Sequence, residues 1–149
     1  MSLMEQINAD FKQAMLAHDE IKKTTLNGLK SAIKYKEVER GAGTSLDDAG
    51  IEDVIAHEVK SRNDSIAIYE QAGDSDRANK EKAERDILAI YLPKQLTKEE
   101  LASKIAEIIT GGGYKAADFG KVMGLAKKEI GNAADGAAIA AAVKEYFAQ

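Results

Sequence analysis

Hydrophobic residues recur along most of this chain at spacings of three and four, which is the period of an amphipathic helix. Short β-branched runs, such as residues 108–110, lack the strict alternation of a strand. The pattern therefore predicts an all-α protein. Seven helices are expected, over residues 3–17, 20–40, 47–71, 75–91, 98–110, 117–130 and 136–147.

Capping residues support most of these boundaries. Ser2-x-x-Glu5 and Thr97-x-x-Glu100 are capping boxes, in which a hydroxyl and a carboxylate satisfy each other's backbone N–H groups. Four other helices are preceded by a Ser or Asp that can accept a hydrogen bond from the first turn: Asp19, Ser45, Asp74 and Asp135. The run Gly111-Gly112-Gly113 is expected to be a loop, because glycine weakens helices.

The only proline, Pro93, marks the predicted domain boundary. A proline disfavours helix at the residue before it, so Leu92 should end the preceding segment. We expect an N-terminal helical domain over residues 1–92, built around a long helical hairpin region. A C-terminal three-helix domain should follow over residues 93–149.

Charge and composition exclude several function classes. The net charge is −4, with a small positive excess after residue 93 and an acidic N-terminal half, so any RNA contact would need a local basic patch. The absence of cysteine rules out disulfides and thiolate zinc sites, and it favours a reducing, cytoplasmic location. Neither a secretory signal nor a membrane span is evident, and His18 and His57 are too far apart in sequence to suggest a metal site.

No recognisable catalytic motif is present. The chain contains no GxxxxGK[ST] phosphate loop, no HExxH and no GxSxG motif, and DFGKVMG at 118–124 follows no predicted strand. We therefore expect no catalytic residue, no metal and no cofactor. DFGKVMG is better interpreted as the interior of a helix.

Three charged residues fall inside the apolar stripes of the third and fourth helices. Glu58 and Arg62 are one turn apart, and Glu84 lies as far after the turn at Gly73 as Arg62 lies before it. Antiparallel packing should bring Arg62 to Glu84, with Glu58 nearby. An ion pair that fixes the helix register is the favoured interpretation. A carboxylate pair for acid–base chemistry is the alternative, which arginine disfavours because it lowers carboxylate pKa values.

Two C-terminal segments, AIYLPKQLTKEEL (89–101) and ADFGKVMGLAKKEIGNAADG (117–136), resemble the GatB/YqeY family. The segment EVKSRNDSIAIYEQAGDSDRANKEKAERDIL (58–88) is similar to the stand-alone YqeY branch, so the resemblance covers residues 1–149. It implies a C-terminal unit similar to the tail domain of the GatB component of aspartyl/glutamyl-tRNA amidotransferases. That tail helps to hold tRNA, and the family is commonly classed under carbon–nitrogen ligase activity with glutamine as amido-N-donor.

The resemblance and the lysine charges together suggest a set of tRNA-contacting residues. These are Lys94, Gln95, Gly120, Lys121, Gly124, Lys127, Lys128, Gly131 and Asn132. The lysines carry point charges that suit phosphate. For Gly120 and Gly124 the residues themselves favour a structural role over binding, since two glycines one turn apart let a neighbouring helix approach closely. Pro93 and Asp135 are expected to be structural, at the domain boundary and as a helix cap.

Three function hypotheses remain open at this point. The leading one is a tRNA-linked accessory protein that binds tRNA or the components of a tRNA-dependent amidotransferase. The second is a component of glutamine-dependent amide transfer to mischarged tRNA. The third is a protein-interaction scaffold without an RNA role, suggested by the acidic N-terminal half.

Overall fold

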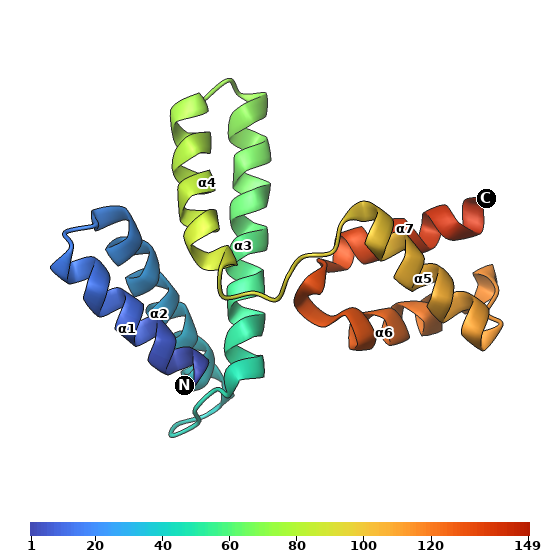
Figure 1. Ribbon diagram of the computed structural model, residues 1–149, viewed down its shortest axis with the longest axis horizontal. Coiled ribbons are helices and arrows are strands. Elements are labelled where there is room, and N and C mark those ends of the chain that lie inside the picture. The colour runs from blue at the N-terminus through green and yellow to red at the C-terminus, as the bar shows by residue number, and fades with distance from the viewer. The chain divides into compact units, whose positions relative to one another are not determined.

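A computed structural model describes residues 1–149 and confirms the all-α prediction (Figure 1). It contains seven α-helices and no strand: α1 Leu3–Leu16, α2 Glu20–Arg40, α3 Asp48–Gln71, α4 Ser75–Ala89, α5 Lys98–Gly112, α6 Phe119–Ile130 and α7 Gly136–Ala148. Two short 3-10 turns flank α6, at Ala116–Asp118 and Gly131–Ala133. The chain divides into two compact units, Met1–Leu92 and Pro93–Gln149. No helix has the length and apolar character needed to cross a membrane.

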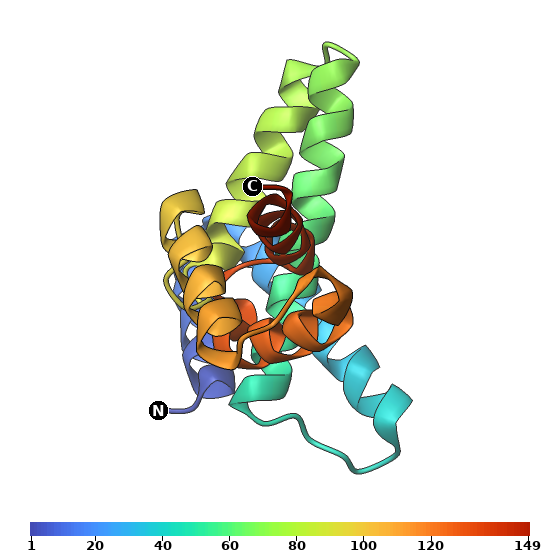
Figure 2. The same cartoon turned by 90° about the vertical axis from the view of Figure 1, so that its right-hand side faces the viewer.

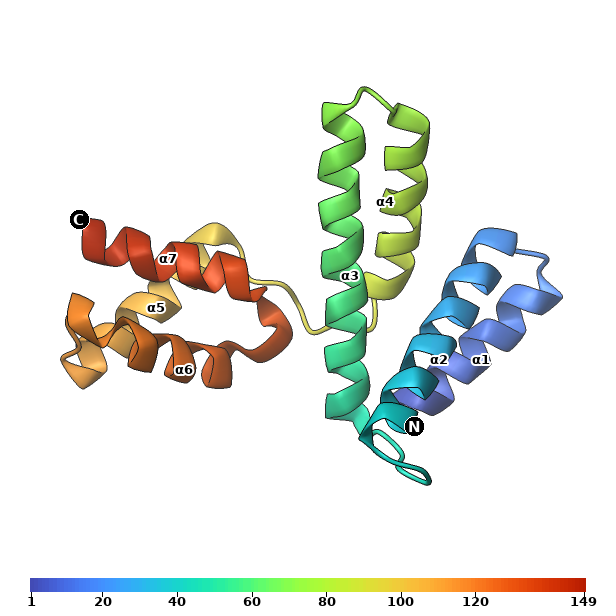
Figure 3. The same cartoon turned by 180° about the vertical axis from the view of Figure 1, so that it is seen from behind.

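The first unit consists of two helical hairpins, α1–α2 and α3–α4, joined by the loop of residues 41–47 (Figures 2 and 3). The first helices of the two hairpins are tied together where they begin, because the Leu3 N–H donates to the Asp48 carboxylate at 3.0 Å. The apolar stripes of the helices meet in one core. Its buried members are Ile7, Leu26, Leu29, Ile33, Leu46, Ile51, Ile55, Leu88 and Tyr91.

The second unit packs α5, α6 and α7 around a core of its own (Figure 1). Its buried members are Leu101, Ile105, Ile109, Val122, Ala126, Ile130, Ile139 and Val143. The segment before α5 is fastened to the turn between α6 and α7. The Leu96 N–H donates to the Ala133 carbonyl at 2.8 Å, and the Gln95 amide donates to the Asn132 carbonyl at 2.8 Å.

The glycine run was wrongly predicted to be a loop. Gly111 and Gly112 continue α5, and only Gly113 leaves the helix, in the left-handed conformation with φ of 64°. Its N–H donates back to the Ile109 and Thr110 carbonyls. The helix continues through Gly111 and Gly112 because Ile105 and Ile109 are anchored in the core. The left-handed cap therefore forms at the third glycine of the run and not at the first.

The start of α3 also differs from the prediction. Asp47, and not Ser45, caps this helix, since its carboxylate accepts from the Gly50 N–H at 2.8 Å. The two capping boxes, at Ser2 and Thr97, and the caps at Asp19 and Asp74 are present as expected.

Candidate nucleic-acid interface

Helix α6 is amphipathic, and its inner side fixes which residues face solvent. Val122, Ala126 and Ile130 are buried in the core of the second unit. The helix follows the 3-10 turn Ala116–Asp118 and ends at Ile130, with Gly131 as its C-cap residue, whose φ of 56° suits glycine.

The opposite side of α6 contains only glycines and lysines. On a helical wheel, these residues span about 120°. All are exposed: Gly120, Lys121, Gly124, Lys127, Lys128 and, at the C-cap, Gly131. We call this set the α6 outer face. The acidic residue of α6, Glu129, lies beyond its edge by the same wheel.

The two helical glycines of this face have no packing role within the chain. A Cβ atom added to Gly120 or Gly124 would meet no other atom within 4 Å. The interpretation that they make room for a neighbouring helix is therefore wrong. A glycine in a helix interior costs about 1 kcal/mol relative to alanine, which applies to Gly124, while Gly120 lies in the first turn of α6. No contact within the chain requires glycine at these positions, and the exposed helix backbone there is available to a ligand or partner.

The lysines of the α6 outer face are electrostatically available. None of Lys121, Lys127 and Lys128 forms an ion pair within the chain. The Lys121 ammonium lies 5.5 Å from the centre of the Tyr114 ring, a cation–π arrangement that leaves the lysine side chain exposed.

Sequence reasoning missed the platform beneath Lys121. The Tyr114 ring packs against Gly112, where an added Cβ would lie only 2.1 Å from a ring carbon. A glycine run immediately before an aromatic residue was the available signal. The ring thus lies between the backbone of α5 and the Lys121 ammonium, next to the α6 outer face.

The remaining predicted contact residues lie around the turn between α6 and α7. Lys94 is exposed. The Gln95 side chain is used in hydrogen bonds within the chain, because its amide nitrogen donates to the Pro93 carbonyl at 2.9 Å as well as to the Asn132 carbonyl. Asp135 caps α7 by accepting from the Ala138 N–H at 2.7 Å.

The charged cluster of the first unit is an ion-pair network. Arg62 Nη1 donates to Glu58 Oε2 at 3.0 Å, and Arg62 Nε lies 3.5 Å from Glu84 Oε2. The Arg62 and Glu84 side chains are only 18% and 19% exposed. Both carboxylates face a permanently charged guanidinium. The network joins α3 to α4, and its geometry suits register better than acid–base chemistry.

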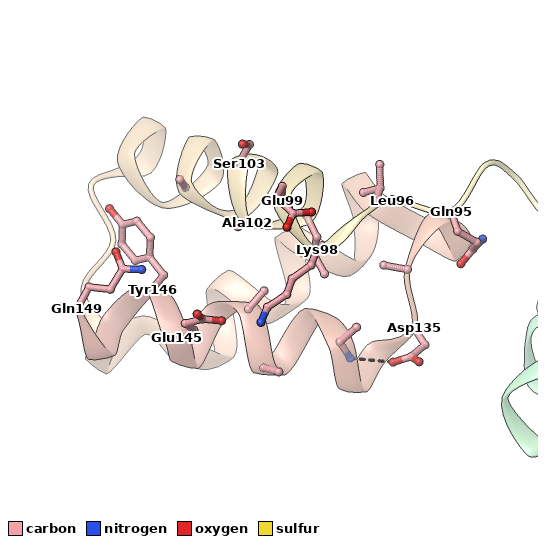
Figure 4. A pocket seen from close by; sticks show the side chains of 16 residues that line it. Gln95, Leu96, Lys98, Glu99, Ala102, Ser103, Asp135, Glu145, Tyr146 and Gln149 are labelled. Carbon is pink, nitrogen blue, oxygen red and sulfur yellow. Dashed lines mark hydrogen bonds between the residues drawn. The ribbon is translucent and has the colours of Figure 1, made fainter. Parts of the chain in front are cut away.

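A groove of about 830 Å³ runs between α5 and α7 (Figure 4). Alanines form much of its lining, including Ala102 and Ala138, and the side chains of Lys98, Glu145 and Tyr146 lie along it. None of the six residues of the α6 outer face lines this groove. No group of three or more His, Cys, Asp or Glu side chains in the chain is arranged to hold a metal ion.

The fold places the chain among small all-α proteins built from two helical units. Residues 4–147 match the family model described as Yqey-like protein, so the chain belongs to this family.

Curated relatives share the name "Altered inheritance of mitochondria protein 41, mitochondrial". The chain is 32% identical to the Lachancea thermotolerans protein over 106 residues, which is 70% of this chain and 56% of the relative. It is 36% identical to the Kluyveromyces lactis protein over 107 residues, 70% of this chain and 57% of the relative. It is 32% identical to a Saccharomyces cerevisiae protein over 124 residues, which is 79% of this chain and 66% of the relative. The matched region thus spans somewhat more than half the length of the first two relatives.

These relatives contradict the predicted cytoplasmic location, because each of them is named as a mitochondrial protein. The prediction was based chiefly on the absence of cysteine. The absence of cysteine does not identify a compartment.

Proposed function

We propose that this chain is a tRNA-linked accessory protein that holds tRNA on the α6 outer face of its C-terminal unit. The proposal starts from the resemblance of residues 89–136 to the tail of the amidotransferase component GatB. The observation that carries it is the pair of exposed glycines, Gly120 and Gly124, with open space above them and unpaired lysines around them.

The chemistry of this face suits a nucleic-acid backbone. Bare helix backbone at the glycines lets a sugar–phosphate chain approach closely, and lysine ammonium groups attract phosphate oxygens as mobile point charges. The half-buried Tyr114 ring lies under Lys121, where an unstacked base at a bend of the RNA could contact its edge. With an overall charge of −4, binding should depend on this local patch and not on the whole molecule.

The proposal is tested by an electrophoretic shift with bulk tRNA over a range of salt concentrations. We expect a shift at low salt that weakens steeply as salt is added, because bound lysines release counterions from the phosphates. Absence of any shift at low salt, from protein with a normal helical circular dichroism spectrum, would reject RNA binding. In that case, a protein that co-purifies with the chain after RNase treatment would favour the scaffold hypothesis instead.

A further inference from the structure

Helix α2 carries a row of exposed residues on the side away from the core of its unit. Its inner side buries Leu26, Leu29 and Ile33. The exposed row is spaced alternately by three and four residues and consists of Ile21, Thr24, Gly28, Ser31, Tyr35 and Val38. We call it the α2 outer row. Its three large members, Ile21, Tyr35 and Val38, are 54%, 74% and 63% exposed.

The spacing of the α2 outer row is that of a helix-pairing seam. Alternating steps of three and four place residues at the a and d positions of a two-helix coiled coil. Gly28 lies near the middle of both the row and the helix, and a Cβ atom added there would meet nothing within 4 Å. A glycine inside a helix weakens it, and nothing within the chain requires glycine at this position.

We propose that two copies of this chain pair through antiparallel α2 helices, with the twofold axis passing beside Gly28 and Ser31. The row is self-complementary in that arrangement. When Gly28 of one copy is set opposite Ser31 of the other, Ile21 faces Val38 and Thr24 faces Tyr35. The tyrosine ring is then received by the small residues Thr24 and Gly28, and the pairing closes on itself as an isologous dimer.

A parallel pairing fits the same row poorly. Each residue would then face its own copy, so two glycines would meet at position 28 and leave a gap, while two tyrosines would crowd position 35. The antiparallel arrangement also avoids like charges at one edge of the row, where Lys34 flanks Asn27.

The size of the row sets the strength of the dimer. Stable protein interfaces bury roughly 800 Å² on each partner, and six residues of one helix supply less than that. The dimer should therefore be weak and reversible, with a dissociation constant on the order of micromolar or above.

Sedimentation velocity of the full chain across concentration tests this proposal. We expect a shift from monomer to dimer for the natural sequence, and at least a tenfold weaker dimer for the double variant Tyr35→Glu/Val38→Glu. Ile68→Glu is the matched control, because Ile68 lies on α3 and is 64% exposed. A monomer at every concentration, or equal weakening by the control, would overturn the proposal.

Cysteine cross-linking tests the orientation, and the natural chain contains no cysteine to interfere. Ile21→Cys and Val38→Cys variants are oxidised separately and as a mixture. In an antiparallel dimer the two like cysteines are about 25 Å apart along the axis, while Cys at 21 and Cys at 38 face each other. A disulfide formed only in the mixture supports the arrangement. Efficient disulfides within either variant alone, or none in the mixture, would contradict it.

Discussion

At the scale of single residues, the same amino acid has opposite roles at adjacent positions. Gly111 and Gly112 are both in the last turn of α5. Nothing lies within 4 Å of a Cβ added at Gly111, whereas a Cβ at Gly112 would overlap the Tyr114 ring. Gly112 is therefore required by a side chain two residues later, and Gly111 is not.

We predict opposite effects of alanine at these two positions. Gly111→Ala should stabilise the second unit by about 0.5–1 kcal/mol, the helix-propensity gain. Gly112→Ala should destabilise it by about 1–2 kcal/mol, because the displaced Tyr114 ring loses its packing against the core. Urea denaturation followed by circular dichroism measures both. Equal and favourable effects of the two substitutions would show that Tyr114 is not held in this position.

Tyr91 is a second residue whose surroundings have a measurable consequence. Its hydroxyl donates to Asp10 Oδ2 at 2.5 Å, which joins the end of the first unit to α1. Burial raises the pKa of Tyr91 above its ordinary value, and the hydrogen bond and the negative charge of Asp10 add to the shift.

This raised pKa predicts a loss of stability in alkali. The folded state retains the Tyr91 proton when the unfolded chain, with a tyrosine pKa of about 10, has begun to lose it. The stabilisation is complete below pH 10 and is lost as the pH rises toward the folded-state pKa. Tyr91→Phe should cost about 1 kcal/mol at pH 7. It should also reduce the fall in unfolding free energy between pH 9 and pH 11.

Tyr35→Phe is the control for this experiment, measured at low protein concentration, because the Tyr35 side chain is 74% exposed. Lysines titrate in the same pH range, so the informative quantity is the difference between each variant and the natural protein. If the two tyrosine variants show the same pH dependence, Tyr91 does not contribute it.

At the scale of elements, Arg62 shows how far helix register can be derived from sequence. Arg62 lies as many residues before the turn at Gly73 as Glu84 lies after it. The two side chains meet between α3 and α4. Because the network is half-buried, removing its only cation would leave the carboxylates of Glu58 and Glu84 without their partner.

Arg62→Leu should therefore lower the unfolding free energy by about 1–3 kcal/mol. Arg77→Ala serves as the comparison, because the Arg77 side chain is 71% exposed beside Asp74 and its loss should cost no more than about 0.5 kcal/mol. Chemical denaturation of both variants at pH 7 checks the difference. A small effect of Arg62→Leu would mean that hydrophobic packing alone fixes the register.

The elements that sequence predicted well are those defined by local chemistry. Capping boxes at Ser2 and Thr97 and the apolar periodicity gave most helix boundaries, since each depends on neighbours within one turn. The end of α5 was missed because core anchoring of Ile109 outweighs glycine propensity. The empty space around Gly120 and Gly124 could not be predicted, because the sequence does not show whether another helix packs against the side of α6 that carries these glycines.

At the scale of the whole molecule, the two units have separate cores and offer different surfaces. The first presents the acidic half of the chain and the exposed row of α2. The second presents the glycine and lysine face of α6. The cytoplasmic prediction belongs to this scale too, and it is contradicted by relatives that are named as mitochondrial proteins. The proposed tRNA contact requires only the second unit, so its test can be confined to lysines of that unit.

The salt dependence of tRNA affinity tests this central claim most directly. Lys121→Ala/Lys127→Ala/Lys128→Ala is compared with Lys98→Ala/Lys104→Ala/Lys144→Ala, which removes three exposed lysines of the same unit from α5 and α7. We predict that the α6 variant loses about two to three units of the slope of log affinity against log salt, and the control loses little. Equal loss in both variants, or an unchanged slope in the α6 variant, would contradict the assignment of tRNA binding to the α6 outer face.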